Sequence, residues 1–376
     1  MCSFKFGFDL PVENEVSSFS NNNDESQHID DSRETSNKHS DNDSKDGKMP
    51  LSLINMNTFL STMKGQPQSW NYSEIILQKG IGTKESIHMS TCSYKSLKRI
   101  THSEQPFYAD NDADKEIKHI SLMAQQNTDI IPGKYEGGLK VWECSIDLCN
   151  YLHEQICEMK SNNLHSLDTS EMVDNDVQIA LSSGGYTVEL GCGHALPGCL
   201  VLKEAMETYR TASECGNESS PVVLFTDYNS FVLRDVTLPN ILLNITEKEN
   251  TNEVLNRLKS VTGLVAGDWM ELSSRLCDTS LGTTCTLPED GRFDLILAAE
   301  TTYTSSSAKD TALWLYNHLK VGSGVGLVAT KRYYFGVGGG SDAFRKASVS
   351  HGLKLDLLRE YNDGNSNIRD LWRVRL

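Results

Sequence analysis

The sequence predicts an α/β protein built on a doubly wound, mostly parallel β-sheet, and three features of the chain lead to this prediction. After residue 183, apolar runs of strand length alternate with helix-length segments. Most of these runs are apolar at consecutive positions, which is typical of strands buried on both faces of a parallel sheet. The last two strand-like segments are joined by a short turn-rich segment, which predicts a terminal antiparallel hairpin.

Five strand-and-helix units are predicted in this region. Before them, Leu139, Trp142, Ile146, Cys149 and Leu152 recur at helical spacing and predict an amphipathic helix. Polar insertions are expected at about 158–183 and 276–290. The predicted strands are Thr187–Leu190, Val222–Thr226, Leu264–Gly267, Phe293–Ala298 and Val325–Thr330, and the predicted helices between them include Leu196–Tyr209 and Ala308–Leu319.

The two ends of the chain complete the predicted organisation. Leu353–Glu360 and Leu371–Leu376 flank Asp363-Gly364-Asn365 and form the hairpin, which brings the predicted sheet to seven strands. Residues 13–48 are rich in Ser, Asn and Asp and have almost no large apolar side chains, so we expect a disordered acidic tail. We expect residues 1–130 to be a largely disordered or irregular N-terminal region, and residues 131–376 to be one folded domain.

The composition narrows the classes of function. The chain of 376 residues has a formal net charge of −16 and a pI of about 5.1, so we expect no direct nucleic-acid substrate and favour a basic protein partner. Its ten cysteines include no CxxC pair and no accompanying His cluster, so we expect reduced thiols and no bound metal. With no secretory signal and no apolar stretch of ~18 residues, we expect a soluble protein of the cytoplasm and nucleus, with the nucleolus as one option.

A glycine turn directly after the first predicted strand is the strongest local signal of a binding site. Within Val188–Gly198, Gly191 and Gly193 permit a sharp turn and a close approach of the backbone to a ligand. No Lys-Ser/Thr pair follows, which argues against a phosphate loop, and Glu189 before the glycines is unusual for a dinucleotide turn. The alternative is a strand-to-helix turn with a structural role alone.

Acidic side chains follow the next two predicted strands. Asp227 lies 34 residues after Gly193, where a carboxylate can accept the ribose hydroxyls of a nucleoside. Its alternative role is the N-cap of the following helix. Asp268 and Trp269, which follow Gly267, suit the amine and the ring of an adenine, and the alternative is a strand-end turn with a core tryptophan.

Glu300 follows Ala299 at the end of the fourth predicted strand. In a doubly wound sheet this strand borders the point where the strand order reverses, so an acid there faces both cofactor and substrate. Asp294, at the start of the same strand, is expected to be structural.

A set of longer sequence blocks between residues 132 and 345 is particular enough to resemble one family. The blocks are Pro132–Cys144, the glycine turn, Asp227–Ser230, Asp235–Asn240, Gly267–Trp269, Glu300–Tyr303 and Tyr334–Gly340. In this order they resemble the eukaryotic protein-histidine N-methyltransferases whose known substrate is a large-subunit ribosomal protein, and Phe4–Phe8 is similar to that family's N-terminus. One departure is Ala195, where the family usually has a third glycine.

The resemblance implies a seven-stranded class I methyltransferase (Rossmann-like) domain that uses S-adenosylmethionine. The resemblance also implies that the helix before the sheet lines the cofactor site. The alternative role for Trp142 is to anchor that helix in the core. Together with the motifs above, the expected cofactor-binding residues are Val141, Trp142, Glu143, Cys144, Ser145, Glu189, Gly191, Gly193, Asp227, Tyr228, Asn229, Gly267, Asp268, Trp269 and Ala299.

The implied activity is methylation of the tele nitrogen of a histidine in a large-subunit ribosomal protein, carried out by a monomer. An imidazole is already nucleophilic near neutral pH and needs an acceptor for its other ring N–H. The candidate acceptors are Glu300, Asn229 and the backbone carbonyls near Gly338–Gly340. We expect Phe335, Gly336, Gly338, Gly339 and Gly340 to shape the substrate slot, with a flexible loop before a helix as the alternative.

Two other functions stay open at this point. One is a lysine methyltransferase of the related non-histone branch, and the other is a cofactor-binding scaffold without turnover.

Overall fold

The structure is a computed structural model that describes residues 51–62, 72–78, 91–97, 129–131, 133–162, 176–182, 185–214, 221–245, 252–276, 283, 285–362, 364 and 367–376. The predicted acidic tail, the Phe4–Phe8 segment and the turn residues Asp363 and Asn365 lie outside the described residues. The proposed division of the chain at residue 131 stays a prediction.

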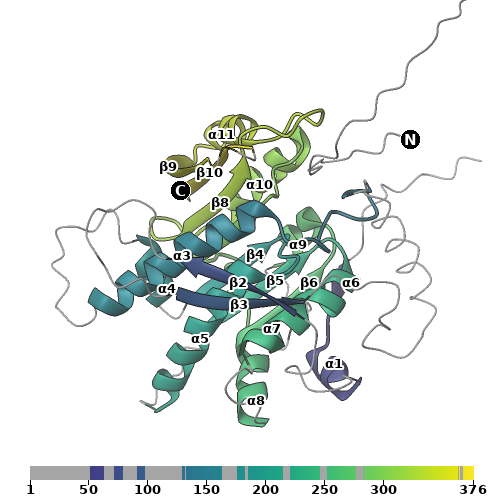
Figure 1. The fold of residues 1–376 in the computed structure, drawn as a ribbon, viewed down its shortest axis with the longest axis vertical. Helices are drawn as coiled ribbons and strands as arrows, with labels where there is room; N and C mark the ends of the chain where they lie inside the picture. The colour runs from purple at the N-terminus through teal and green to yellow at the C-terminus, as the bar shows by residue number, and fades with distance from the viewer. Residues whose placement is uncertain are drawn as a thin grey trace, which may run out of the picture.

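One mixed sheet of eight strands, in the order β1-β6-β5-β4-β7-β8-β10-β9, organises the described residues (Figure 1). The strands are β1 (Ser52–Leu53), β4 (Tyr186–Leu190), β5 (Val222–Asp227), β6 (Thr262–Ala266), β7 (Leu295–Ala299), β8 (Val325–Lys331), β9 (Lys354–Tyr361) and β10 (Arg369–Arg375). The five strands from β6 to β8 run parallel, β10 is antiparallel to β8 and β9, and β1 is antiparallel to β6.

This strand order confirms the predicted class I methyltransferase fold. The chain moves outward from β4 through β5 to β6, then returns to the other side of β4 as β7 and continues to β8. The strand order therefore reverses between β4 and β7, which is where doubly wound sheets form binding sites. The terminal hairpin is also confirmed, with β9 and β10 paired from Arg375↔Lys354 to Arg369↔Tyr361.

Two parts of the observed fold differ from the prediction. The edge strand β1 adds an eighth strand from a segment expected to be irregular. The polar insertion predicted at 158–183 is partly wrong, because α3 (Glu143–Asn162) extends into it and α4 (Asp176–Ser182) lies within it. In α4, Val177, Ala180 and Leu181 are buried on one helical face, a short amphipathic pattern that the polar neighbours conceal.

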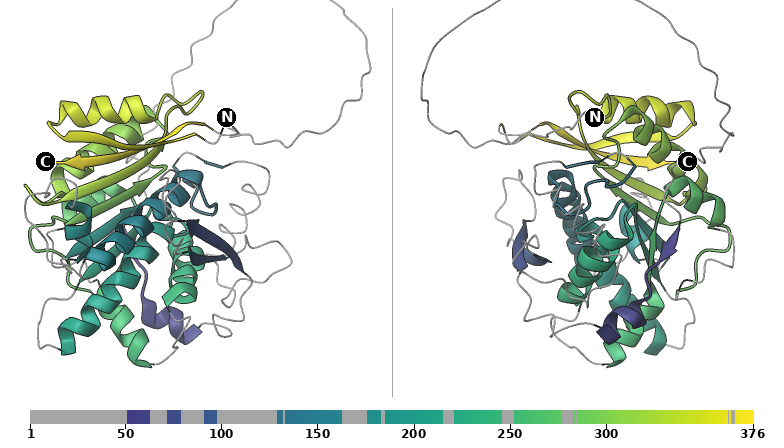
Figure 2. Two further views of the ribbon diagram at one scale, coloured as in Figure 1. Left: turned by 60° about the vertical axis from the view of Figure 1, so that its left-hand side comes forward. Right: turned by 90° about the vertical axis from the view of Figure 1, so that its right-hand side faces the viewer.

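Helices cover both faces of the sheet, and the central strands are buried on both sides (Figure 2). In β7, Leu295 and Leu297 face one core cluster while Ile296 and Ala298 face the other. The first cluster includes α1 (Met56–Thr62), α3, α4, α5 (Leu196–Glu214), α7 (Leu238–Ile245) and α8 (Asn252–Val261). The second includes α9 (Trp269–Arg275), α10 (Ser305–His318) and α11 (Ser341–Ser350).

The described parts of the N-terminal region pack on this domain. Met56 and Phe59 of α1 are buried in the first core cluster. β2 (Tyr72–Gln78) and β3 (Thr91–Leu97) pair as a separate antiparallel ribbon that contacts α3 and α7. Within the described part of the chain, no helix is both long and apolar enough to cross a membrane.

Candidate functional site

A cavity of about 280 Å³ lies at the carboxyl ends of β4, β5 and β7, at the point where the strand order reverses. Its predicted lining residues are Val141, Trp142, Ser145, Glu189, Gly191, Gly193, Asp227, Tyr228, Asp268, Trp269, Ala299 and Glu300. The predicted residues that do not line it, although the structure describes them, are Glu143, Cys144, Asn229, Gly267, Phe335, Gly336, Gly338, Gly339 and Gly340.

The glycine turn forms the floor of this cavity. Gly191 and Gly193 have φ angles of 61° and 47°, so both occupy the left-handed region that glycine reaches without strain. A Cβ on Gly191 would lie 3.1 Å from the ring of Trp269, and one on Gly193 would lie 3.2 Å from a backbone oxygen of Gly138. The glycines therefore allow two walls of the cavity to approach the turn closely.

Ala195, which stands where the family usually has a third glycine, has a left-handed backbone conformation. Its φ is 56°, and its side chain is fully buried. A non-glycine residue in this conformation costs on the order of 1 kcal/mol, and the turn retains its shape with that strain.

Two backbone amides, one from the glycine turn and one from the segment after β5, hold the Asp227 side chain in place. Its Oδ2 accepts a hydrogen bond from the Gly193 amide at 3.1 Å, and its Oδ1 accepts one from the Asn229 amide at 3.0 Å. The N-cap of the following helix α6 (Ser230–Val232) is Asn229, so Asp227 does not have the alternative capping role. Burial raises the pKa of Asp227 to about 6, although both amides oppose this rise.

Glu189 of β4 lies beneath the glycine turn with only 2% of its surface exposed. Its Oε2 accepts a hydrogen bond from the Gly198 amide in the first turn of α5 at 2.9 Å. The partial positive charge at a helix N-terminus favours a carboxylate there. Burial nevertheless dominates and raises the pKa of Glu189 to about 8.

The buried Glu189 predicts a pH-dependent stability that Glu189→Gln removes. Its pKa is about 4.5 when exposed and about 8 in the fold, so the unfolded chain releases this proton first as the pH rises. Wild-type stability from this group therefore falls between pH 4.5 and 8, by a few kcal/mol in order of magnitude. In urea unfolding of the cofactor-free proteins, Glu189→Gln should gain stability relative to wild type across this window. A difference that stays constant with pH contradicts the prediction.

Asp268 and Trp269 reach the cavity from the start of α9. Asp268 is the N-cap of that helix, and its Oδ1 accepts hydrogen bonds from the amides of Met270 and Glu271 at 2.9 and 3.1 Å. Trp269 lies with its ring beside Gly191, and its indole nitrogen is buried. Asp268 thus has both the structural role and a place in the cavity wall, so its contact with an adenine amine stays a prediction.

The loop 133–138 forms a wall that the sequence analysis did not assign. Asn229 holds it, because its Nδ2 donates to the Lys134 carbonyl at 2.7 Å and its Oδ1 accepts from the Glu136 amide at 3.2 Å. Glu136 accepts a hydrogen bond from the Tyr303 hydroxyl on the opposite wall. Burial raises the pKa of Glu136 against the opposing hydrogen bonds from Tyr303 and Gly133. Asn229 therefore anchors this loop, and its candidate role as imidazole acceptor has no support from its position.

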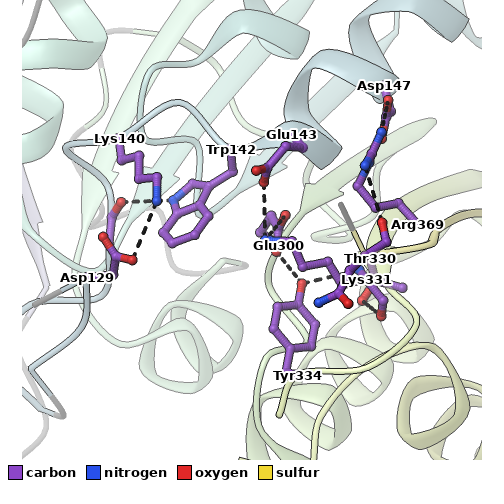
Figure 3. A network of polar contacts seen from close by, with 12 residues as sticks. Asp129, Lys140, Trp142, Glu143, Asp147, Glu300, Thr330, Lys331, Tyr334 and Arg369 are labelled. Carbon is purple, nitrogen blue, oxygen red and sulfur yellow. Dashed lines mark hydrogen bonds and ion pairs between the residues drawn. The ribbon is translucent and has the colours of Figure 1, made fainter. Parts of the chain in front are cut away.

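Glu300 lies at the centre of a polar network between the cavity and the core (Figure 3). Its φ is 59°, a left-handed conformation that is rare for a residue other than glycine. Its Oε2 accepts a hydrogen bond from the Tyr334 hydroxyl, and its Oε1 lies 3.4 Å from Lys331 Nζ. Glu143 Oε2 is 3.2 Å from the same ammonium, which accounts for its turning away from the cavity.

A second, smaller cavity shares a wall with the first. Its lining residues are Ile130, Glu136, Trp142, Glu300, Tyr303 and Tyr334. Four of these, Glu136, Trp142, Glu300 and Tyr303, also line the main cavity. We call this second cavity the aromatic slot, because three of its walls are aromatic rings.

The predicted substrate segment Phe335–Gly340 packs beside the site. Gly340 donates its amide to the Thr302 carbonyl at 2.8 Å, and Ser305 donates its hydroxyl to the Gly338 carbonyl at 2.7 Å. Phe335 is 75% exposed. The segment therefore supports the strand end that carries Glu300 and Tyr303, while a direct role in binding substrate stays a prediction.

A substitution at Gly339 distinguishes a supporting role of this segment from a direct role in binding substrate. A Cβ there would lie 2.2 Å from the carbonyl carbon of Tyr303, so Gly339→Ala should lower stability by about 1–3 kcal/mol or more. Gly352→Ala is the control, since it meets no atom within 4 Å and adds only left-handed strain, about 1 kcal/mol. Thermal unfolding of both variants measures the difference. An unchanged melting temperature in Gly339→Ala, combined with lost activity, would favour the substrate slot instead.

Sequence reasoning missed part of the cavity wall. The unassigned lining residues are Glu136, Gly137, Gly138, Lys140, Cys192, His194, Met270, Thr301, Tyr303, Thr304, Ser306, Ser307 and Asp310. The signal for several of them was available, because Glu136–Lys140 and Thr301–Tyr303 lie inside the blocks that resemble the histidine methyltransferases.

Curated proteins similar to this chain carry one name. The chain is 32% identical over 248 residues to "Histidine protein methyltransferase 1 homolog" of Dictyostelium discoideum, across 66% of this chain and 60% of that protein. It is 31% identical over 249 residues to the mouse protein of the same name, across 62% and 55% of the two chains. It is 33% identical over 231 residues to "Histidine protein methyltransferase 1" of Schizosaccharomyces pombe, across 56% of each chain.

The resemblance to this family is confirmed. The matched part of the chain spans less than two thirds of the length of these relatives. No family model matches the chain.

Among solved structures, the likenesses are remote. An O-methyltransferase from Bacillus cereus in complex with SAH is 11% identical with a TM-score of 0.34, across 60% of this chain and 90% of that one. A putative SAM-dependent methyltransferase from Streptococcus mutans is 12% identical with a TM-score of 0.35, across 56% and 50%. The fold assignment rests on the strand order of the sheet itself.

Proposed function

We propose that this protein is an S-adenosylmethionine-dependent protein-histidine N-methyltransferase. The names of its relatives and its methyltransferase fold support this activity. The finer proposal is that the target is the tele nitrogen of a histidine in a large-subunit ribosomal protein.

The chemistry of the main cavity fits the cofactor. The sulfonium of S-adenosylmethionine is a cation, and acidic side chains outnumber lysines in the cavity wall, although Glu189, with a pKa raised to about 8, is largely neutral at pH 7. The lining acids are Glu136, Glu189, Asp227, Asp268, Glu300 and Asp310, and the lining ammonium is that of Lys140. Asp227 and Trp269 line the cavity, and we propose that Asp227 accepts the ribose hydroxyls and that the Trp269 ring packs against the adenine. When bound, this cofactor supplies an electrophilic methyl carbon.

The observation that carries the proposal is the position of Glu300, which lies in the wall of both the main cavity and the aromatic slot. The slot itself has a volume of about 20 Å³, so a planar imidazole would lie in the main cavity and pack against Trp142 or Tyr303 at the wall that the two cavities share. The Glu300 carboxylate can accept the N–H of the pros nitrogen. That hydrogen bond selects the tautomer whose tele nitrogen carries the lone pair, and it stabilises the positive charge that the ring gains on methylation.

The slot suits histidine better than lysine. Glu136 and Glu300 both line it, and nearby carboxylates favour the charged form of an amine. A lysine ammonium has no lone pair and would have to lose its proton against these charges. An imidazole, with an unperturbed pKa of ~6.5, is largely neutral at pH 7 and needs no such step.

The proposed partner is a basic protein, consistent with a net charge of −16 on this chain. We also propose that the enzyme is a monomer and that it meets this partner in the cytoplasm or in the nucleus, including the nucleolus.

Transfer of a labelled methyl group tests the substrate. The full chain is incubated with methyl-labelled S-adenosylmethionine and with either purified large-subunit ribosomal proteins or intact large subunits. The proposal predicts label in one ribosomal protein, and a variant of that protein with its target histidine replaced should take up none. A parallel incubation with a whole-cell extract distinguishes the remaining outcomes. Label only in non-ribosomal proteins of the extract would move the substrate elsewhere while leaving the activity intact, and no label in any protein would favour the scaffold.

A further inference from the structure

Lys331, the last residue of β8, is the buried cation of the Glu300 network. Its side chain is 4% exposed, and its Nζ lies 3.4 Å from Glu300 Oε1 and 3.2 Å from Glu143 Oε2. The ammonium also lies 5.1 Å from the ring centre of Trp142 and 5.9 Å from that of Tyr334, two of the rings that line the aromatic slot. Lys331 itself lines neither cavity.

The ammonium form of Lys331 is favoured in this place. Burial on its own lowers the pKa of a lysine, but Glu300 and Glu143 outweigh burial and raise the pKa of Lys331. In return, the pKa of Glu143 is lowered, because Lys331 overcomes the rise that burial causes. The acidic side chains of Glu143 and Glu300 thus share one ammonium next to the slot.

Other groups around Glu300 do not replace this cation. Tyr334 donates to Glu300 and stays neutral, since burial raises the pKa of its hydroxyl. Burial likewise raises the pKa of the Cys144 thiol. The titratable groups that face Glu300 are Glu143 and Cys144 of α3, Lys331 and Tyr334 of β8 and its following loop, Glu136 of the 133–138 loop, and Tyr303.

We propose that Lys331 is a positioning residue that holds the Glu300 side chain in the orientation in which it accepts a hydrogen bond from the target imidazole. The inference rests on the proposed function. A carboxylate in this orientation accepts the pros N–H and leaves the tele lone pair exposed. A side chain turned away from the slot leaves that N–H without its acceptor and no longer selects the tautomer.

The same contacts orient Glu300. The left-handed backbone at Glu300 is strained, and such a conformation persists only where its surroundings hold it. Here the Tyr334 hydroxyl binds one carboxylate oxygen and Lys331 pairs with the other. The Lys331 amide also donates to the Tyr334 hydroxyl at 3.4 Å, so both partners of Glu300 are tied to the same end of β8.

The test compares Lys331→Met, Lys331→Arg and wild type in the rate of histidine methylation at pH 7. Without the ammonium, Glu300 Oε1 loses its ion-pair partner and the side chain is free to turn, so Lys331→Met should lose roughly 30-fold or more of kcat. Lys331→Arg keeps a cation beside Glu300 and should recover most of that loss. The affinity for S-adenosylmethionine, measured by calorimetry, should differ from that of wild type by less than about threefold in both variants.

A matched control separates this effect from the loss of any buried ion pair. Lys320→Met removes the ammonium that pairs with Asp294 at 2.8 Å, at the opposite end of β7. It should lose stability while its kcat stays close to that of wild type. If Lys331→Met shows the same behaviour as Lys320→Met, Lys331 is structural and the inference is overturned.

The failure of the inference and the failure of the proposed function are distinguishable. The inference is overturned when wild type methylates histidine and Lys331→Met keeps the wild-type kcat. A wild type that leaves every histidine unmethylated overturns the proposed function instead.

Discussion

Asp227→Ala is expected to abolish cofactor binding at micromolar concentrations of S-adenosylmethionine. Asp227 is buried and lines the main cavity, and we propose that its side chain accepts both ribose hydroxyls. Two hydrogen bonds to a charged acceptor are worth roughly 1.5–3 kcal/mol each, so the dissociation constant should rise on the order of 100-fold to 10,000-fold. Calorimetric titration of the folded variant measures this loss directly.

Asp227→Ala also removes two structural hydrogen bonds, so its controls must show whether a loss of stability alone lowers cofactor affinity. Asp227→Ala leaves the amides of Gly193 and Asn229 without their acceptor. Asp227→Asn keeps an oxygen for one of them and should retain more stability while still binding the cofactor weakly. Asp294→Ala removes a carboxylate from the opposite end of the sheet and should leave affinity near wild type. Unchanged affinity in Asp227→Ala would show that the ribose assignment is wrong.

Glu300→Gln is expected to lower kcat by roughly 100-fold or more while leaving cofactor affinity close to wild type. Glutamine keeps the length of the side chain and an oxygen acceptor, but it has no charge to stabilise the developing imidazolium. It also removes the ion pair with Lys331. Single-turnover kinetics with saturating cofactor isolates this effect on the methyl-transfer step.

Glu154→Gln serves as the matched control for Glu300→Gln. Glu154 lies on α3 and forms an ion pair with Arg359, and it lines neither cavity. We expect its kcat to match that of wild type. Equal activity in Glu300→Gln and wild type would move the imidazole acceptor to another group, and Glu136 is the other carboxylate of the aromatic slot.

The pattern of apolar runs predicted the central sheet well, for a physical reason. Strands buried on both faces need apolar residues at consecutive positions, and β5, β6 and β8 carry such runs. The edge strand β1 escaped prediction because its two residues pair on one side only and are both exposed. Helix α4 escaped because its buried face consists of few residues within a polar stretch.

The residues at strand ends were also predictable, because chain topology brings the carboxyl ends of parallel strands to one edge. Asp227, Glu300 and the glycine turn lie together for this reason. The wall formed by Glu136 and Tyr303 was not predictable in the same way. Those two residues are 167 positions apart and meet because the 133–138 loop folds over the cavity, where Asn229 and Tyr228 are among its anchors. The Lys331 pair likewise depends on the left-handed turn at Glu300, which no local sequence pattern indicates.

The position of the transferred methyl group tests the central claim most directly. The full chain is incubated with methyl-labelled S-adenosylmethionine and a large-subunit ribosomal protein, and the product is digested, sequenced by mass spectrometry and hydrolysed to amino acids. The account predicts a single labelled histidine that co-migrates with tele-methylhistidine. Label on a lysine, or on the pros nitrogen of histidine, would contradict the geometry proposed for Glu300 and the aromatic slot.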